Sequence, residues 1–246
     1  MSEVEPSKIV WTPELTRKFW NHTSQRPSGD QTYFTSIYGP AIFKWARRRV
    51  KLDKGMTVCD WGCGRGDLAA NLVASGIHVV CVDQVASLTP SIAGDPLISF
   101  TAFANVAHLR DNMVDGAFLI ETVEHLDDQG LAEVLTALHR IVRPNGFLIV
   151  TTPNEEQLSR SEVFCPNCDT VFHPMQHVRS VSSKWLSQVA NEFGWHARYS
   201  EALEFEPRGA GRFVARARNF RSRWSGARLA TMPPHLAWYG VNSKPR

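Results

Sequence analysis

The chain has 246 residues, of which 43% are hydrophobic, and it carries 27 Lys and Arg against 24 Asp and Glu. A chain of this size can bury a full core, so we expect one domain with additions. The N-terminus lacks the cationic start and apolar core of a signal peptide, and no apolar run approaches the roughly 20 residues that cross a membrane. We therefore expect a soluble, cytoplasmic protein. Its five cysteines, an odd number, favour thiols or metal ligands over disulfides.

Residues 1–50 are expected to form a helical N-terminal cap. Thr12 followed by Pro13 is typical of a helix start, with threonine as the N-cap and proline at the first helical position. Residues 33–40 lead into a second predicted helix, since apolar residues recur at helical spacing through 41–47.

The stretch from Thr57 to Asp67 predicts a buried strand that ends in a glycine-rich turn and then opens a helix. Gly62, Gly64 and Gly66 stand at alternate positions, where the backbone can bend sharply and a ligand can approach closely. The amides at the turn and at the helix start suit a polar or anionic group. Nicotinamide dinucleotides bind to similar turns, so this pattern alone leaves the ligand open.

Two details favour a different ligand. The dinucleotide pattern is Gly-x-Gly-x-x-Gly, whereas here the third glycine comes one residue early and Asp67 takes its place. Asp60 precedes the first glycine, where its carboxylate repels a pyrophosphate and attracts an ammonium or sulfonium group. At these residues the chain resembles the class I S-adenosylmethionine (SAM)-dependent methyltransferases, whose first motif is a strand ending in Asp/Glu-x-Gly-x-Gly-x-Gly. The resemblance implies that Asp60, Gly62, Cys63 and Gly64 contact SAM.

A second buried strand is expected over residues 77–83, and it ends in Asp83. A carboxylate at this position accepts both ribose hydroxyls in nucleotide-binding α/β folds, and the resemblance assigns that role to Asp83. A third strand is expected over residues 96–103, followed by Asn105 as the candidate for the adenine amino group. The resemblance also implies cofactor contacts from Gln84 and Val106.

The fourth predicted strand, residues 114–120, leads into Glu121-Thr122-Val123-Glu124-His125. A helix with one apolar face is expected over residues 127–142, and a turn then leads into a fifth strand over 147–151. From about residue 55 to 155 the series of elements resembles the same family. The resemblance implies that Glu121 is also a cofactor contact.

The C-terminal part is expected to hold a helix over residues 183–193 and strands over 195–199 and 235–241. The resemblance implies that the last strand is antiparallel. We therefore expect a Rossmann-like α/β fold with a seven-stranded, mostly parallel sheet and helices on both faces. The methyltransferase domain would span residues 51–246, with an insertion at about 202–234.

This insertion is rich in arginine. Nine of the 27 basic residues lie in residues 207–246, which contain no acidic residue, so the rest of the chain holds 18 basic and 24 acidic residues. Phe213, Phe220 and Trp224 alternate there with arginines, a pattern that suits an anionic partner or RNA through phosphate contacts and base stacking. A solvated arginine-rich excursion explains the pattern equally well.

A second informative stretch lies in a loop at about residues 155–180. Cys165 and Cys168 form a Cys-x2-Cys pair, and His173 and His177 follow. Four soft ligands within thirteen residues are compatible with one tetrahedral structural zinc.

A competing hypothesis uses His177 differently. Glu121, Glu124 and His125 together with His177 are similar to the metal site of Hen-type small-RNA 2′-O-methyltransferases, where a divalent ion binds the hydroxyls of a terminal ribose. The same Glu-x-x-Glu-His-Leu sequence also occurs in methyltransferases of quinones and other small molecules that use no metal. Both proposals need His177, so at most one of them holds. A third alternative is that His125, His173 or His177 acts as a general base without a metal.

We therefore expect a SAM-dependent methyltransferase that aligns an in-line displacement in a dry pocket. The favoured reaction is O-methylation of a sugar or other small metabolite, that is, of a small-molecule or glycan acceptor. His125 is the first candidate base and His177 the second. The alternatives are 2′-O-methylation of a terminal RNA ribose and a catalytically silent, cofactor-binding partner subunit. The sequence predicts no oligomeric state.

Overall fold

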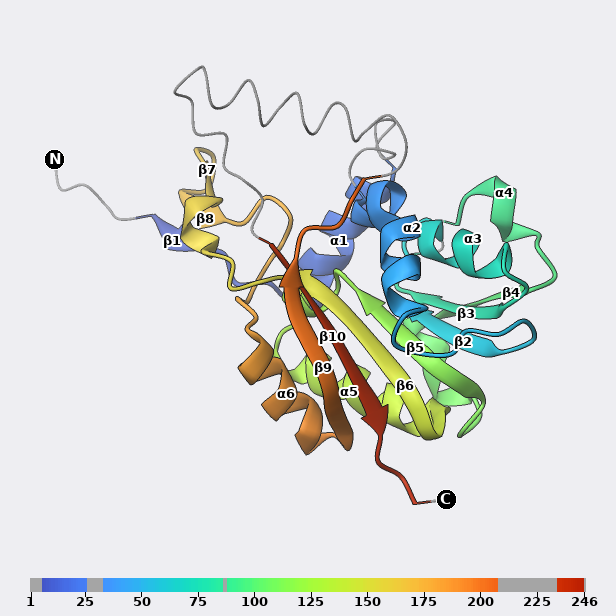
Figure 1. Cartoon of the computed structure of the whole chain (residues 1–246). Helices are drawn as coiled ribbons and strands as arrows, with labels where there is room; N and C mark the ends of the chain where they lie inside the picture. The colour runs from blue at the N-terminus through green and yellow to red at the C-terminus, as the bar shows by residue number, and fades with distance from the viewer. Residues whose placement is uncertain (1–5, 26–32, 86–87, 208–233, 246) are drawn as a thin grey trace, which may run out of the picture.

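The computed structural model describes residues 6–25, 33–85, 88–207 and 234–245, and a seven-stranded sheet runs through its centre (Figure 1). The strand order is β4-β3-β2-β5-β6-β10-β9. In chain order the strands are β2 (Thr57–Trp61), β3 (His78–Asp83), β4 (Ile98–Ala102), β5 (Val114–Ile120), β6 (Val142–Pro153), β9 (Trp195–Leu203) and β10 (His235–Asn242).

Strands β2 to β6 are parallel to one another, whereas β10 is antiparallel to both β6 and β9. The predicted fold class, with its antiparallel last strand, is confirmed. In such a sheet the carboxyl ends of β2, β3, β4, β5 and β6 meet along one edge, where open α/β sheets bind their ligands.

Helices cover both faces of this sheet (Figure 1). They are α1 (Pro13–Ser24), α2 (Phe34–Ala46), α3 (Asp67–Val73), α4 (Pro90–Ala93), α5 (Asp128–Ile141) and α6 (Ser183–Glu192). The described residues also form the 3₁₀ turns η2 (Phe103–His108), η3 (Val123–His125) and η4 (Leu158–Arg160). Two buried clusters flank the sheet, one including residues of α5 and α6 and the other residues of α2 and α3. Strand side chains alternate between the faces, so Cys59 belongs to the first cluster and Val58 to the second.

Local chemistry explains where two of these helices begin. The side chain of Thr12 accepts a hydrogen bond from the Leu15 amide, as expected for the N-cap of α1. Asp127 caps α5 in the same way, through the amide of Gly130. The buried residues of α5 recur at spacings of three and four, which places its apolar face against the sheet.

Strand β6 departs from the expectation of a turn followed by a strand over residues 147–151. It already begins at Val142, and its pairing with β5 shifts register between Val114 and Gly116. Asn145 has a positive φ of 60° inside this stretch. The residues expected to form a turn therefore belong to β6, as an irregularity at which the strand bends without ending.

A second, three-stranded sheet was not predicted. It consists of β1 (Ser7–Lys8), β8 (Thr170–Phe172) and β7 (Val163–Cys165), in the order β1-β8-β7. Strand β1 pairs in parallel with β8, and β7 and β8 form an antiparallel hairpin. Figure 1 shows this small sheet standing off the large one. The stretch predicted as a Cys/His loop therefore contains an extended hairpin tied to the N-terminal segment.

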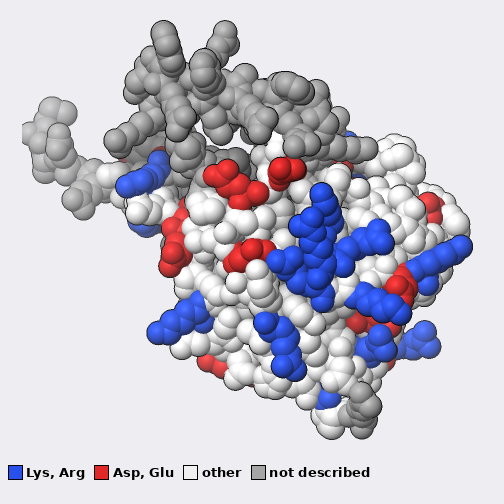
Figure 2. Space-filling model, viewed as in Figure 1, with Lys and Arg blue, Asp and Glu red and all other residues white. Residues whose placement is uncertain are grey.

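Most of the arginine-rich insertion, residues 208–233, lies outside the described residues, and so do Phe213, Phe220 and Trp224. Within the described residues, Figure 2 shows Lys and Arg side chains gathered around the C-terminal end of α2, where the sequence is basic from Lys44 to Lys54. None of the described helices is long and apolar enough to span a bilayer.

Candidate active site

The glycine turn follows β2 at the carboxyl edge of the large sheet. The amides of Gly62 and Cys63 donate to the carbonyl of Val82, which holds the turn against β3. Gly62 has a φ of 76°, and a Cβ there would lie 2.5 Å from Oγ1 of Thr122. Gly64 has a φ of 51°, and a Cβ there would lie 2.9 Å from the ring of Tyr33. Both positions therefore need glycine for backbone conformation and for space.

Asp60 stands at the end of β2 with only 2% of its surface exposed. Its Oδ2 has no hydrogen-bond partner among the described residues. Burial, and then the charges of Asp83 and Asp67, raise the pKa of Asp60 to about 7. A buried carboxylate oxygen without a partner is unfavourable unless a cation compensates it. This chemistry fits the ammonium and sulfonium groups of SAM.

Asp83 lies at the tip of β3, across the turn from Asp60. Its Oδ2 accepts the amide of Gly64 at 2.8 Å and its Oδ1 accepts the amide of Val85 at 3.0 Å. Burial raises the pKa of Asp83, and these backbone hydrogen bonds oppose the rise. Because a carboxylate oxygen accepts more than one hydrogen bond, both oxygens retain the capacity to bind ribose hydroxyls.

Tyr33 is a site residue that the sequence analysis did not single out. Its ring packs against Gly64 just before α2 begins. Burial, and then the charge of Asp83, raise the pKa of this phenol to about 12. Tyr33 therefore covers the glycine turn as a neutral side chain. The only sequence signal for it is its place in the predicted N-terminal cap.

The remaining predicted cofactor contacts differ in their surroundings. Asn105 is exposed on η2, whereas Val106 is buried and its carbonyl accepts a hydrogen bond from Arg140. Gln84 is half-buried directly after Asp83. Cys63 is buried in the turn, where a hydrogen bond with Cys81, and then burial, raise the pKa of its thiol. Cys63 can therefore reach a ligand mainly through its backbone.

Glu121 follows β5 with a positive φ of 46°. Its Oε1 accepts the Thr151 hydroxyl at 2.8 Å, and its Oε2 lies 3.3 Å from Nε2 of His235. The ring of His235 is stacked on Phe34 of α2. Glu121 therefore joins the ends of β5, β6 and β10 beside the N-terminal helices.

A second constellation begins at η3. Glu124 is 2% exposed and accepts the hydroxyl of Thr152 at 3.0 Å. Burial, and then the charge of Glu121, raise its pKa well above the ordinary value. Burial, and then the charge of His177, lower the pKa of His125 to about 3, so this imidazole is neutral. Its Nδ1 lies 3.4 Å from the carbonyl of Gln176, which can only accept, so Nε2 presents the lone pair.

Glu156 organises the histidines on the other side of this constellation, and the sequence analysis did not single it out either. Its Oε2 lies 2.5 Å from Nδ1 of His177, and its Oε1 lies 3.4 Å from Nε2 of His173. Burial alone would raise its pKa, but its contacts with His173 and His177 outweigh burial and lower the pKa to about 2. The ionised carboxylate accepts a hydrogen bond from Nδ1 of His177. The lone pair on Nε2 of His177 is therefore available to accept a proton or to bind a metal.

His173 has the opposite tautomer. Its Nδ1 accepts the backbone amides of Met175 and His177, both at 3.3 Å. Its Nε2 must then carry the proton, and it points toward Glu156. In this tautomer His173 supports Glu156 and offers no lone pair to a metal.

The described residues contain two groups of three potential metal ligands whose ligand atoms all lie within 4.8 Å of one another: Glu124, His125 and His177, and Glu156, His173 and His177. Neither group includes a cysteine or Glu121. The four predicted zinc ligands are therefore not brought together. Strand β8 separates them, because three residues of strand put Thr170 and His173 roughly 10 Å apart.

Helix α1 lies against the histidines. Nε1 of Trp20 donates to Oε1 of Gln176 at 2.9 Å, and Nε2 of Gln176 donates to the carbonyl of His125 at 3.1 Å. The Trp20 ring also meets the His125 ring edge-on at 4.8 Å between centroids. This helix therefore closes one side of the constellation.

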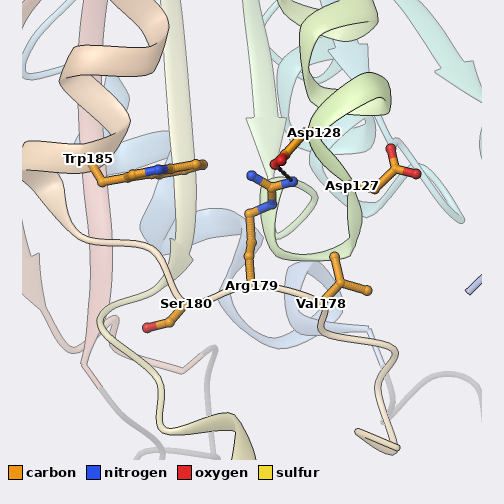
Figure 3. A pocket seen from close by; sticks show the side chains of 6 residues that line it. All are labelled: Asp127, Asp128, Val178, Arg179, Ser180 and Trp185. Atoms are coloured by element: carbon orange, nitrogen blue, oxygen red, sulfur yellow. Dashed lines mark hydrogen bonds and ion pairs between the residues drawn. The ribbon is translucent and has the colours of Figure 1, made fainter. Parts of the chain in front are cut away.

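A hollow of about 430 Å³ lies beside the segment that follows His177 (Figure 3). Its lining residues are Asp127, Asp128, Val178, Arg179, Ser180 and Trp185. Arg179 donates to the Leu126 carbonyl, pairs with Asp128 at 3.0 Å and lies over the Trp185 ring. The hollow contains none of the buried carboxylates described above, and its arginine ties the segment after His177 to the start of α5.

The sheet order, the glycine turn and the buried acidic side chains at the strand ends define a SAM-dependent methyltransferase. The methyltransferase domain family matches residues 38–199, and the chain belongs to this family. Among similar sequences, the ubiquinone biosynthesis O-methyltransferase of Leptothrix cholodnii is 27% identical over 84% of this chain and 90% of that protein. A counterpart from Pseudomonas aeruginosa is 27% identical over 63% of this chain and 66% of that protein.

Two solved structures show the same fold. The 1,6-didemethyltoxoflavin-N1-methyltransferase of Burkholderia thailandensis, with bound 1,6-didemethyltoxoflavin and S-adenosylhomocysteine, has a TM-score of 0.66 at 16% identity and covers 97% of this chain and 94% of its own. A chain from the complex between the Haloferax volcanii Trm112 methyltransferase activator and the putative methyltransferase has a TM-score of 0.63 at 18% identity, covering 94% and 99%. At these identities the likeness concerns the fold alone.

Proposed function

We propose that this chain transfers the methyl group of SAM to a hydroxyl group of a small molecule, with His177 as the base. The observation that carries the proposal is the pair between Glu156 and His177 Nδ1. When bound, SAM supplies an already activated methyl group, so the chain mainly has to align the acceptor and remove its proton.

His177 suits the role of base better than His125. The pKa of His125 is about 3, and so weak a base takes little of a hydroxyl proton near neutral pH. The Nδ1 proton of His177 instead faces an ionised carboxylate, which stabilises the imidazolium formed when Nε2 accepts a proton. Glu156 would thus be a positioning residue that fixes the tautomer of His177.

The acceptor is proposed from chemistry and relatives together. An acceptor that carries a hydroxyl needs a base, whereas many other nucleophiles do not. The similar sequences named ubiquinone biosynthesis O-methyltransferase support O-methylation. Phenols and sugar hydroxyls are both compatible with this chemistry, and a substrate panel that contains catechol-type phenols and nucleotide-linked sugars separates them.

A second candidate function keeps the reaction and changes the way the hydroxyl is activated. Glu124, His125 and His177 bring one carboxylate and two Nε2 lone pairs together, a set that suits a divalent cation. Thr152, the carbonyl of Gln176 and Glu156 hydrogen-bond to these three residues and orient them, as metal ligands need. Such an ion would bind two vicinal hydroxyls, as in a catechol or a terminal ribose.

RNA 2′-O-methylation and a catalytically silent subunit remain proposals of lower rank. The arginines and aromatic residues of the insertion that motivated RNA binding all lie outside the described residues. A site with a buried carboxylate, an oriented histidine and an intact glycine turn supports a catalytic role over a catalytically silent one.

The test compares His177→Asn, Glu156→Gln and Glu124→Gln with His78→Asn, a control at an exposed histidine. We expect all four proteins to bind SAM with unchanged affinity by calorimetry. Methyl transfer to the acceptor should be lost in His177→Asn and retained in His78→Asn, with or without EDTA. Activity that EDTA abolishes, that Mg²⁺ or Mn²⁺ restores and that Glu124→Gln lacks would favour the metal. Full activity of His177→Asn would refute both forms of the proposal.

A further inference from the structure

The tip of the β7–β8 hairpin brings two cysteine side chains to the surface. Cys165 ends β7 and pairs in register with Thr170, which begins β8. Cys168 is exposed, and its Sγ lies 3.0 Å from Oγ1 of Thr170. The two thiols therefore sit within one tight turn, Cys165-Pro166-Asn167-Cys168.

The turn leaves both thiols within reach of the surface, since Cys165 is half-buried and Cys168 is exposed. Asp169 adopts a φ of 51°, a left-handed conformation uncommon for a residue other than glycine, and this lets the chain leave the turn directly into β8. Two cysteines separated by two residues have the spacing that zinc ligands commonly show, and metals bind them as thiolates.

Two thiolates are half of a tetrahedral site for a thiophilic cation. The other half does not come from the described residues, because no group of three close ligand atoms there includes either cysteine. His173 and His177 lie beyond β8 and are engaged with Glu156. The other three cysteines are buried in the core, and the segments outside the described residues contain neither cysteine nor histidine.

We propose that Cys165 and Cys168 bind a divalent cation of the Zn²⁺ class together with the same two cysteines of a second copy of this chain. The cation would then be held by four thiolates across a two-fold axis, and neither copy could complete the site alone.

The surroundings of the turn fit a second copy. Strand β7 is at the edge of the small sheet, which stands off the large sheet (Figure 1). Val163 and Phe164 on this strand are 40% and 53% exposed, and they precede Cys165 directly. An edge strand with exposed apolar side chains is a surface that another chain covers readily.

The experiment measures zinc per chain by mass spectrometry and molar mass by light scattering, on protein purified without a metal-affinity step. We expect half a zinc per chain and a dimer, and a chelator should convert it to a monomer. Cys165→Ser and Cys168→Ser should each lose the zinc and the dimer, while SAM binding stays unchanged and shows that they fold. Cys168→His keeps a soft ligand and should keep both.

Three results would overturn the proposal. The first is protein that contains no zinc and takes none up from a stoichiometric addition. The second is one zinc per chain in a monomer, lost in His173→Asn, which would restore a site within one chain. The third is a dimer that persists in chelator and in both serine variants.

Discussion

Oε2 of Glu156 lies 2.5 Å from Nδ1 of His177, although the two residues are 21 positions apart and bracket the whole β7–β8 hairpin. The hairpin leaves the large sheet after β6 and returns beside the Glu124-His125 turn, so that the carboxylate and the imidazole meet at its base. The proposed base is thus positioned by the closure of a protruding segment.

Replacing Glu156 with glutamine should reduce kcat about 10- to 100-fold, because the amide does not stabilise the imidazolium of His177. The Kd for SAM should stay within about twofold. A pH–rate profile is the decisive readout, since a positioning role predicts that the acidic limb of kcat, where the base must lose its proton, shifts toward lower pH. An unchanged kcat and profile would make Glu156 only a packing residue.

Replacing Asp60 with asparagine should raise the stability of the SAM-free protein above pH 7 and weaken SAM binding at least tenfold. The folded-state pKa of about 7 exceeds the ordinary value of 3.8, so the folded state holds the proton more tightly. Wild-type stability therefore falls as pH rises from about 4 to about 7 and is constant above that. Because each pKa unit corresponds to about 1.4 kcal/mol, the full difference is on the order of 4 kcal/mol.

Urea unfolding of both proteins at pH 5, 6, 7 and 8 checks this dependence. The gap between Asp60→Asn and the wild type should widen with each step up to pH 7. A constant gap would mean that Asp60 does not titrate in this range. Equal SAM affinities would remove Asp60 from the cofactor site.

Replacing Gly62 with alanine should destabilise the protein and weaken SAM binding, whereas Gly55→Ala should only destabilise it. Both glycines have a positive φ, 76° and 87°, so each alanine adds backbone strain of roughly 1 kcal/mol. Only at Gly62 does the new Cβ collide, with Thr122; at Gly55 nothing lies within 4 Å. Calorimetry with SAM and urea unfolding of the two variants separate the shared strain from the collision.

Replacing Trp20 with phenylalanine should lower stability by about 1–3 kcal/mol and raise KM for the acceptor. The ring keeps its contact with His125, but Oε1 of the buried Gln176 loses the donor that it has in the native protein. Steady-state kinetics on the acceptor, with SAM saturating, provide the measurement. If KM for SAM rises instead, α1 covers the cofactor and not the acceptor.

The sequence by itself determined the large sheet. A strand such as β3 consists mainly of β-branched and apolar residues, and helix α5 places its apolar residues at spacings of three and four. The local pattern and the burial therefore agree. The glycine turn could be recognised for the same reason, since alternate glycines after a strand ending in Asp60 constrain the backbone locally. Asp60 and Asp83 lie at strand ends, and the parallel arrangement alone brings them to one edge.

Only the tertiary structure decided which distant side chains meet. Cys165, Cys168, His173 and His177 are close in sequence, but Thr170–Phe172 is extended and separates the cysteines from the histidines. Glu156 and Tyr33 carry no motif, and they join the site because a hairpin returns and an N-terminal segment packs over Gly64. Contacts of this kind depend on loop closure between segments far apart in the chain, which residue spacing does not encode.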